Sequence, residues 1–155
     1  MTTTIKITNL IKNEDKILLI KEWSKRKNGY FWNVVKGTFD SEKDGGLIAS
    51  AIREAKEEVN LDIIIESILS IFEIKRKDDF LLQINFISYA QNGSVPSLSK
   101  THEKDEEIID YKWFNYDEFK LLNENEIMDK RVTIIVNNYF SNQSKYSLSI
   151  IKSVD

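Results

Sequence analysis

Three glutamates at helical spacing carry the strongest chemical signal in the sequence. Glu54, Glu57 and Glu58 lie in residues 47–61, a segment rich in Ala, Lys and Glu that is predicted to form a helix. At about 100° per residue they share one stripe, more than a quarter turn from the apolar stripe of the same helix. That apolar stripe consists of Ile48, Ala51, Ile52, Ala55 and Val59.

This spacing of like charges has a cost. Such a cluster is ordinarily a solvated face, but glutamates three and four residues apart repel one another by a few tenths of a kcal/mol per pair. A bound cation would offset that repulsion. Mg²⁺ prefers carboxylate and carbonyl oxygens together with substrate phosphate oxygens, so the pattern favours a magnesium site.

The elements that must position this helix follow from hydrophobic period and turn residues. Strands are predicted over 5–10, 16–23, 31–35, 63–75, 80–90 and 108–114, with the first two forming a hairpin and the third ending at Gly37. Further helices are predicted over 115–123, where Asn115 and Glu118 have the spacing of a capping box, and over 129–140. Strands interleaved with few, separated helices predict an α/β domain with a mixed sheet.

Composition narrows the classes of function. The 155 residues are expected to form one domain over 1–155, and the absence of Cys and the single His102 leave only oxygen ligands for a metal. With 22 basic and 25 acidic residues the net charge is −3, which argues against binding long nucleic acids but permits a mononucleotide. Neither a signal peptide nor an apolar run of ~18–20 residues is seen, so a cytoplasmic protein without membrane association is expected.

The order of the motif residues resembles the signature of the Nudix hydrolases. Gly37 is followed by an acidic loop and then by Arg-Glu-Ala-x-Glu-Glu-x-Asn-Leu over residues 53–61, similar to the family's Arg-Glu-aliphatic-x-Glu-Glu-x-Gly-aliphatic run. The strand WNVVKG over 32–37 and the later segments 107–114 and 117–119 also resemble family elements, so the likeness extends from the opening hairpin to about Phe119. The resemblance implies a Nudix-type α/β/α sandwich, with a mixed β-sheet between helices.

Three departures from the family pattern affect the loop and the helix end. The stretch between Gly37 and Arg53 is two residues longer than in the family, and Gly45 falls where the pattern has its first glutamate. Glu42 or Asp44 is expected to supply the missing partner of Arg53, through an exposed pair contributing only ~0–1 kcal/mol. Asn60 replaces the glycine that ends the helix and is expected to keep the left-handed turn.

The resemblance implies hydrolysis of the pyrophosphate linkage in a nucleoside diphosphate derivative, using Mg²⁺ or Mn²⁺. A nucleoside triphosphate, a nucleotide sugar and a dinucleoside polyphosphate are all candidate substrates. The physical reasoning agrees, because a diphosphate repels nucleophiles until metal ions neutralise its oxygens and acidify a water.

Metal-site roles follow from the same resemblance. Glu57 and Glu58 are assigned as principal metal ligands, with Glu54 as a further ligand or as the residue that orients the water. The backbone carbonyl of Gly37 completes the shell, since glycine lets the chain approach an ion closely. Arg53 is interpreted as a structural partner that orients Glu57 or a loop carboxylate.

The general base and the substrate contacts are less defined. The base lies either on the helix or in a later loop, where Glu107 is the best candidate and Glu103 the next. Lys36 is expected to contact phosphate. Trp32 represents a group of aromatic residues that either stack on a base or belong to the core, the others being Trp23, Tyr30 and Phe31. His102 either transfers protons or is only solvated.

Two other function classes remain open at this point. A Nudix-fold domain that binds a nucleotide without hydrolysing it is favoured only by the lengthened loop, whereas the full set of helix glutamates favours the enzyme. A purely structural α/β domain requires the motif to be accidental. The sequence names no individual substrate, and a homodimer is an expectation taken from the family alone.

Overall fold

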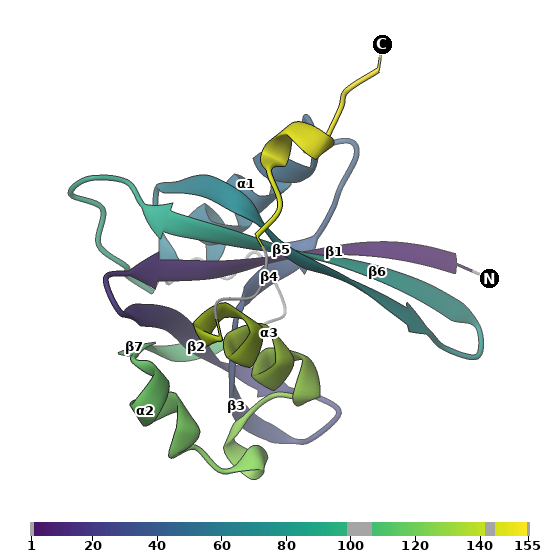
Figure 1. The fold of residues 1–155 in the computed structure, drawn as a ribbon. Helices are drawn as coiled ribbons and strands as arrows, with labels where there is room; N and C mark the ends of the chain where they lie inside the picture. The colour runs from purple at the N-terminus through teal and green to yellow at the C-terminus, as the bar shows by residue number, and fades with distance from the viewer. Residues whose placement is uncertain (1, 99–106, 142–144, 155) are drawn as a thin grey trace.

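The computed structural model describes residues 2–98, 107–141 and 145–154 and shows a twisted mixed sheet with helices packed against it (Figure 1). Within these residues the sheet has seven strands: β1 (Thr2–Asn13), β2 (Lys16–Ser24), β3 (Gly29–Asn33), β4 (Val35–Thr38), β5 (Ile63–Lys75), β6 (Asp79–Ala90) and β7 (Ile108–Phe114). The helices are α1 (Leu47–Val59), α2 (Tyr116–Lys120) and α3 (Lys130–Phe140), with 3₁₀ turns η1 (Glu124–Glu126) and η2 (Leu148–Ile150). No helix in these described ranges is long and apolar enough to span a membrane.

Strand β1 organises the sheet. It forms the expected antiparallel hairpin with β2 and pairs in parallel with β6 along most of its length. Strand β5 joins the far side of β6, β3 and β7 both pair with β2, and β4 pairs with β1. The order β3-β2-β1-β6-β5 therefore contains both parallel and antiparallel neighbours, as the sequence predicted.

The strand expected over 31–35 is in fact two strands. β3 ends at Asn33 paired with Ile20 of β2, and β4 begins at Val35 paired with Asn9 of β1. Between them the side-chain oxygen of Asn33 accepts a hydrogen bond from the backbone N–H of Val34 at 2.8 Å. The chain thus changes its pairing partner from β2 to β1 just before Gly37.

Two hydrophobic clusters hold the layers together. Helix α1 contributes Ala51, Ala55 and Val59 to one cluster, which also contains Ile7 and Ile11 of β1. The other cluster joins the sheet to α3 and includes Leu10, Trp32, Val132, Ile135 and Val136. Adjacent β1 residues therefore face α1 and α3 in turn, which gives the expected helix–sheet–helix sandwich.

The buried face of α1 is rotated relative to the sequence prediction. Ile52 was expected in the apolar stripe but is 41% exposed, whereas Ser50, Glu54 and Glu58 are buried. The helix packs on β4 as well as on β1 and β5, so its contact face is centred on Ala51 and extends toward the glutamates.

The later helices begin as predicted. Asn115 caps α2 in a reciprocal capping box with Glu118, and Asp129 caps α3 by accepting from the N–H of Arg131 at 2.9 Å. Helix α2 ends at Lys120, three residues before the predicted end. These helices and the turn between them close the second cluster through Phe119 and Ile127.

Candidate metal and phosphate site

Helix α1 ends in the predicted left-handed turn. Asn60 adopts φ 53° and ψ 34°, and its N–H donates to the carbonyl of Lys56 at 3.1 Å. The N–H of Leu61 donates to the carbonyl of Ala55 at 3.3 Å, so the turn satisfies two carbonyls of the last helical turns. This fixes the length of the helix that carries the three glutamates.

Glu54 lies directly against Gly37. Its side chain is buried, with the residue only 1% exposed, and a Cβ added to Gly37 would lie 1.7 Å from its Cδ atom. No larger residue fits at position 37 while Glu54 keeps this conformation. The glycine therefore permits a close approach between β4 and the helix, whereas the sequence analysis expected it to allow a close approach to an ion.

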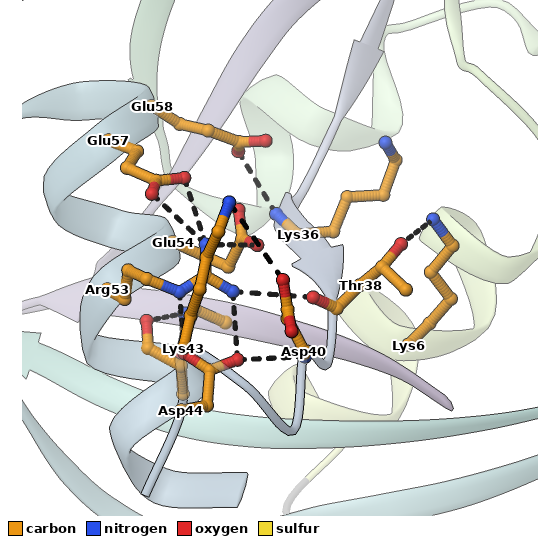
Figure 2. A network of polar contacts seen from close by, with 12 residues as sticks. Lys6, Lys36, Thr38, Asp40, Lys43, Asp44, Arg53, Glu54, Glu57 and Glu58 are labelled. Atoms are coloured by element: carbon orange, nitrogen blue, oxygen red, sulfur yellow. Dashed lines mark hydrogen bonds and ion pairs between the residues drawn. The ribbon is translucent and has the colours of Figure 1, made fainter. Parts of the chain in front are cut away.

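Glu58 contacts the same strand one residue earlier. It is 6% exposed, and its Oε2 accepts a hydrogen bond from the backbone N–H of Lys36 at 3.1 Å (Figure 2). Two of the three helix glutamates are thus packed along β4 instead of forming a solvated face. Glu57, with a side chain 35% exposed, lies at the outer edge.

Arg53 lies at the centre of these carboxylates (Figure 2). Its guanidinium contacts both oxygens of Glu57 at 3.1 and 3.0 Å and Oε1 of Glu54 at 3.0 Å. It also donates to both oxygens of Asp44 at 2.6 and 2.9 Å and to the carbonyl of Thr38 at 3.3 Å. The hydrogen bonds to Asp44 are the main reason that the pKa of Arg53 is raised above its ordinary value.

The loop carboxylate that pairs with Arg53 is Asp44. Its side chain is 1% exposed, and its Oδ2 also accepts from the backbone N–H of Asp40 at 3.0 Å. Hydrogen bonding to Arg53 holds the pKa of Asp44 well below its usual range. Glu42 is exposed, and its backbone N–H donates to Asp40. The expectation of an exposed pair was therefore wrong, because the longer loop folds its aspartate inward.

The carboxylate oxygens on this side of α1 suit a hard divalent cation. Glu54, Glu57 and Glu58 offer carboxylate oxygens along one helix edge, next to a glycine whose backbone can approach an ion. Within the described residues, no three acidic or histidine side chains are already gathered as a metal cluster. In this conformation Arg53 contacts two of these carboxylates and the Lys36 amide contacts the third.

Glu107 lies beside Trp23 and Tyr30, toward the end of the β2–β3 pair that is away from Asn33. Its Oε2 accepts from the hydroxyl of Tyr30 at 2.7 Å, and its carbonyl accepts from the N–H of Trp23 at 2.9 Å. The hydrogen bond to Glu107 is the main cause that raises the pKa of Tyr30. Trp23 and Tyr30 pack edge to face with centroids 5.0 Å apart. Glu103 and His102 lie outside the described residues.

The two predicted substrate contacts have different surroundings. Lys36 follows the break in the sheet, and its ammonium forms an ion pair with Glu22 at 3.1 Å. Trp32 is 8% exposed and packs edge to face on Phe114, with centroids 5.1 Å apart. Trp32 therefore belongs to the core, which is one of the two alternatives left open for the aromatic residues, because β-strand alternation alone did not reveal which face it occupies.

Glu22 is the site neighbour that the sequence analysis missed. It is 1% exposed and lies on β2 after the buried Leu18 and Ile20, at the next position of the same strand face. The available signal was this break in the alternation of a buried strand, where a charged residue requires a partner.

A family model described as "NUDIX domain" matches residues 3–133. No curated protein sequence matches the chain.

Among solved structures, a NUDIX hydrolase from Nitrosomonas europaea has a TM-score of 0.77 at 20% identity, covering 98% of this chain and 97% of its own. A MutT protein from Methanosarcina mazei Go1 has a TM-score of 0.68 at 19% identity, covering 92% and 97%. An ADP-ribose pyrophosphatase from Streptococcus suis has a TM-score of 0.60 at 17% identity, covering 93% and 96%. These likenesses show a shared fold.

Proposed function

The chain belongs to the Nudix family, and on this premise we propose that it is a Nudix-type pyrophosphohydrolase that hydrolyses a nucleoside diphosphate derivative with Mg²⁺ or Mn²⁺. A nucleoside triphosphate, a nucleotide sugar such as ADP-ribose and a dinucleoside polyphosphate are the candidate substrates. One observation supports the proposal above the others: the glutamates of α1 lie along β4, with Glu54 packed directly on Gly37.

The residues of this edge receive distinct roles in the proposal. Glu57 and Glu58 would hold the cation together with the carbonyl of Gly37, and Glu54 would add a ligand or orient the attacking water. When bound, the cation would neutralise phosphate oxygens and lower the pKa of water. Arg53 acts by orienting Glu54 and Glu57, since it contacts both carboxylates and is itself held by Asp44.

Two roles remain, namely the contact with the substrate phosphate and the general base. Lys36 follows the break before Gly37 and is proposed to contact a phosphate of the substrate. The general base is either a helix glutamate or Glu107, which lies beside Tyr30. A cytoplasmic enzyme is part of the proposal, and the net charge of −3 is consistent with a small nucleotide as substrate instead of a long nucleic acid.

The test is a substrate panel of nucleoside triphosphates, nucleotide sugars and dinucleoside polyphosphates, incubated with Mg²⁺ or Mn²⁺ and resolved chromatographically. We expect cleavage of at least one phosphoric anhydride bond, with activity rising toward alkaline pH and lost in excess chelator. Turnover that is undiminished in chelator would refute the metal role. Tight nucleotide binding with no turnover of any panel member would instead establish the non-catalytic binding module.

A further inference from the structure

Glu22 is a buried carboxylate to which the proposed reaction gives no role. It lies near the end of β2 and is among the largest fully buried side chains of the described chain. Burying a carboxylate is strongly unfavourable unless it is paired and hydrogen-bonded. Its partners therefore indicate what the residue is there to hold.

The two partners of Glu22, Asn33 and Lys36, lie on either side of the break between β3 and β4. Oε1 of Glu22 accepts from the Nδ2 group of Asn33 at 2.6 Å and pairs with the ammonium of Lys36 at 3.1 Å. Oε2 is also buried and accepts no hydrogen bond from the described residues. Among the described residues, the carboxylate of Glu22 therefore makes its polar contacts through Oε1, with Asn33 and Lys36.

Lys36 connects Glu22 to the side of α1 that carries the proposed metal ligands. Its side chain is 22% exposed, against 2% for that of Glu22, so part of the lysine is accessible to solvent although its ammonium contacts a buried carboxylate. Its own backbone N–H donates to Glu58. One residue is therefore fixed by its side chain to Glu22 and by its main chain to a proposed metal ligand.

We propose that Glu22 is a positioning residue that orients the Lys36 ammonium toward the diphosphate of the substrate, beside Glu58. The pair with Glu22 fixes the position of this ammonium, whose N–H groups are all donors and suit the oxygens of a phosphate. Fixing a long, flexible side chain before the ligand arrives lowers the entropic cost of binding. The proposal rests on the proposed function, because it assumes that a diphosphate binds at this edge.

The test is a double-mutant cycle on ligand affinity. Binding of α,β-methylene-ADP, whose bridging carbon resists hydrolysis, is measured by calorimetry with Mg²⁺ for wild type, Glu22→Gln, Lys36→Ala and the double variant. We expect each single variant to weaken binding at least tenfold and the double variant to be no weaker than the worse single. The affinity for Mn²⁺ alone should stay within threefold of wild type.

Controls separate positioning from general damage. The pair Lys12–Glu66, 2.7 Å apart on the surface, gives a matched cycle from Lys12→Ala and Glu66→Gln that should leave the affinity unchanged. If Glu22→Gln does not fold, Lys36→Ala and Lys36→Arg decide, because the arginine variant keeps the charge and should stay within threefold of wild type. Normal ligand affinity in Lys36→Ala would then overturn the proposal.

Three further results would also overturn the positioning role: unchanged affinity in Glu22→Gln, strictly additive effects in the cycle, or no binding to wild type. A parallel loss of Mn²⁺ affinity would do the same, since it would indicate collapse of the whole edge. These readouts do not require turnover. A chain that binds the analogue with the expected coupling but hydrolyses no panel member would refute the proposed function alone.

Discussion

Arg53 is the residue that allows several carboxylates to lie close together at one end of α1. It contacts Asp44, Glu54 and Glu57 at 2.6–3.1 Å, so its charge offsets the repulsion expected from glutamates at this spacing. The same contacts restrict the rotamers of two proposed metal ligands. Arg53 therefore both stabilises this cluster of carboxylates and holds Glu54 and Glu57 in position.

The proposed metal ligands can be tested one charge at a time. Glu57→Gln and Glu58→Gln are each expected to lower the hydrolysis rate at least ~100-fold, because each removes a charge from the cation's ligand set. Both should remain folded, since the amide can still occupy the same space. Rates and thermal melts are compared with Glu73→Gln, an exposed glutamate on β5. Near-normal rates in both folded variants would place the site elsewhere.

The contact between Gly37 and Glu54 yields a second prediction. In Gly37→Ala the new Cβ would overlap the Glu54 carboxylate, and because this group ends a flexible side chain it should move aside. We expect a loss of about 1–3 kcal/mol in stability from the overpacking. Displacing the carboxylate by ~1 Å should lower the rate ~100-fold.

Gly45→Ala is the matched control for this prediction. A Cβ at Gly45 meets no atom within 4 Å, so stability and rate should both stay near wild type. Denaturant unfolding and the rate at saturating metal measure the two effects separately. A wild-type rate in folded Gly37→Ala would show that the position of Glu54 is unimportant for catalysis.

At the level of the elements, the loop between β4 and α1 is held by an ion pair whose carboxylate is buried and whose guanidinium is partly exposed. Asp44→Asn leaves Arg53 without its closest charged partner, and because Arg53 keeps Glu54 and Glu57 the loss in stability should be about 1–3 kcal/mol, less than for a fully buried pair. The variant should also raise the metal concentration needed for half-maximal activity, because Arg53 orients Glu57. Glu42→Ala, at an exposed position of the same loop, should change stability by less than about 0.5 kcal/mol.

This pair also predicts a pH dependence. Because the pKa of Asp44 is lowered in the folded state, its stabilisation is fully present above the unfolded value of about 3.9 and is lost as the pH falls through the folded pKa. The difference in unfolding free energy between wild type and Asp44→Asn should therefore be largest near pH 7 and shrink below about pH 4. A difference that stays constant from pH 7 to pH 3 would contradict this role.

What the sequence predicted and what it missed differ in the range of the contacts involved. The helix carrying the glutamates, its left-handed end at Asn60 and the cap at Asn115 depend on neighbours within a few residues, so local patterns were sufficient. The break at Val34 depends on Asn33 meeting Glu22 across the sheet, and the choice of Asp44 over Glu42 depends on the fold of the loop. No local pattern contains that information.

At the level of the whole molecule, a polar network crosses the face of the sheet that α3 covers. The buried Asn85 receives hydrogen bonds from Thr8 and Gln83, and Arg131 at the start of α3 donates to Gln83 at 3.0 Å. Burial alone would raise the pKa of Asp129, but its hydrogen bonds with Arg131 outweigh this and lower it. The helix is therefore attached to β6 by specific polar contacts as well as by apolar packing.

Cation binding should stabilise the entire fold if the edge of α1 is the metal site. A ligand at about 100 times its dissociation constant stabilises the native state by ~2.7 kcal/mol, and ~1 kcal/mol shifts Tm by roughly 2–4 °C for a chain of this size. Saturating Mn²⁺ should thus raise Tm by about 5–10 °C, and chelator should reverse the shift. The chelated protein should still melt cooperatively, because Arg53 already pairs with Glu54 and Glu57. In the double variant Glu57→Gln/Glu58→Gln the shift should nearly vanish, while Glu73→Gln keeps it. An undiminished shift in the double variant would mean that the stabilising cation binds at another part of the molecule.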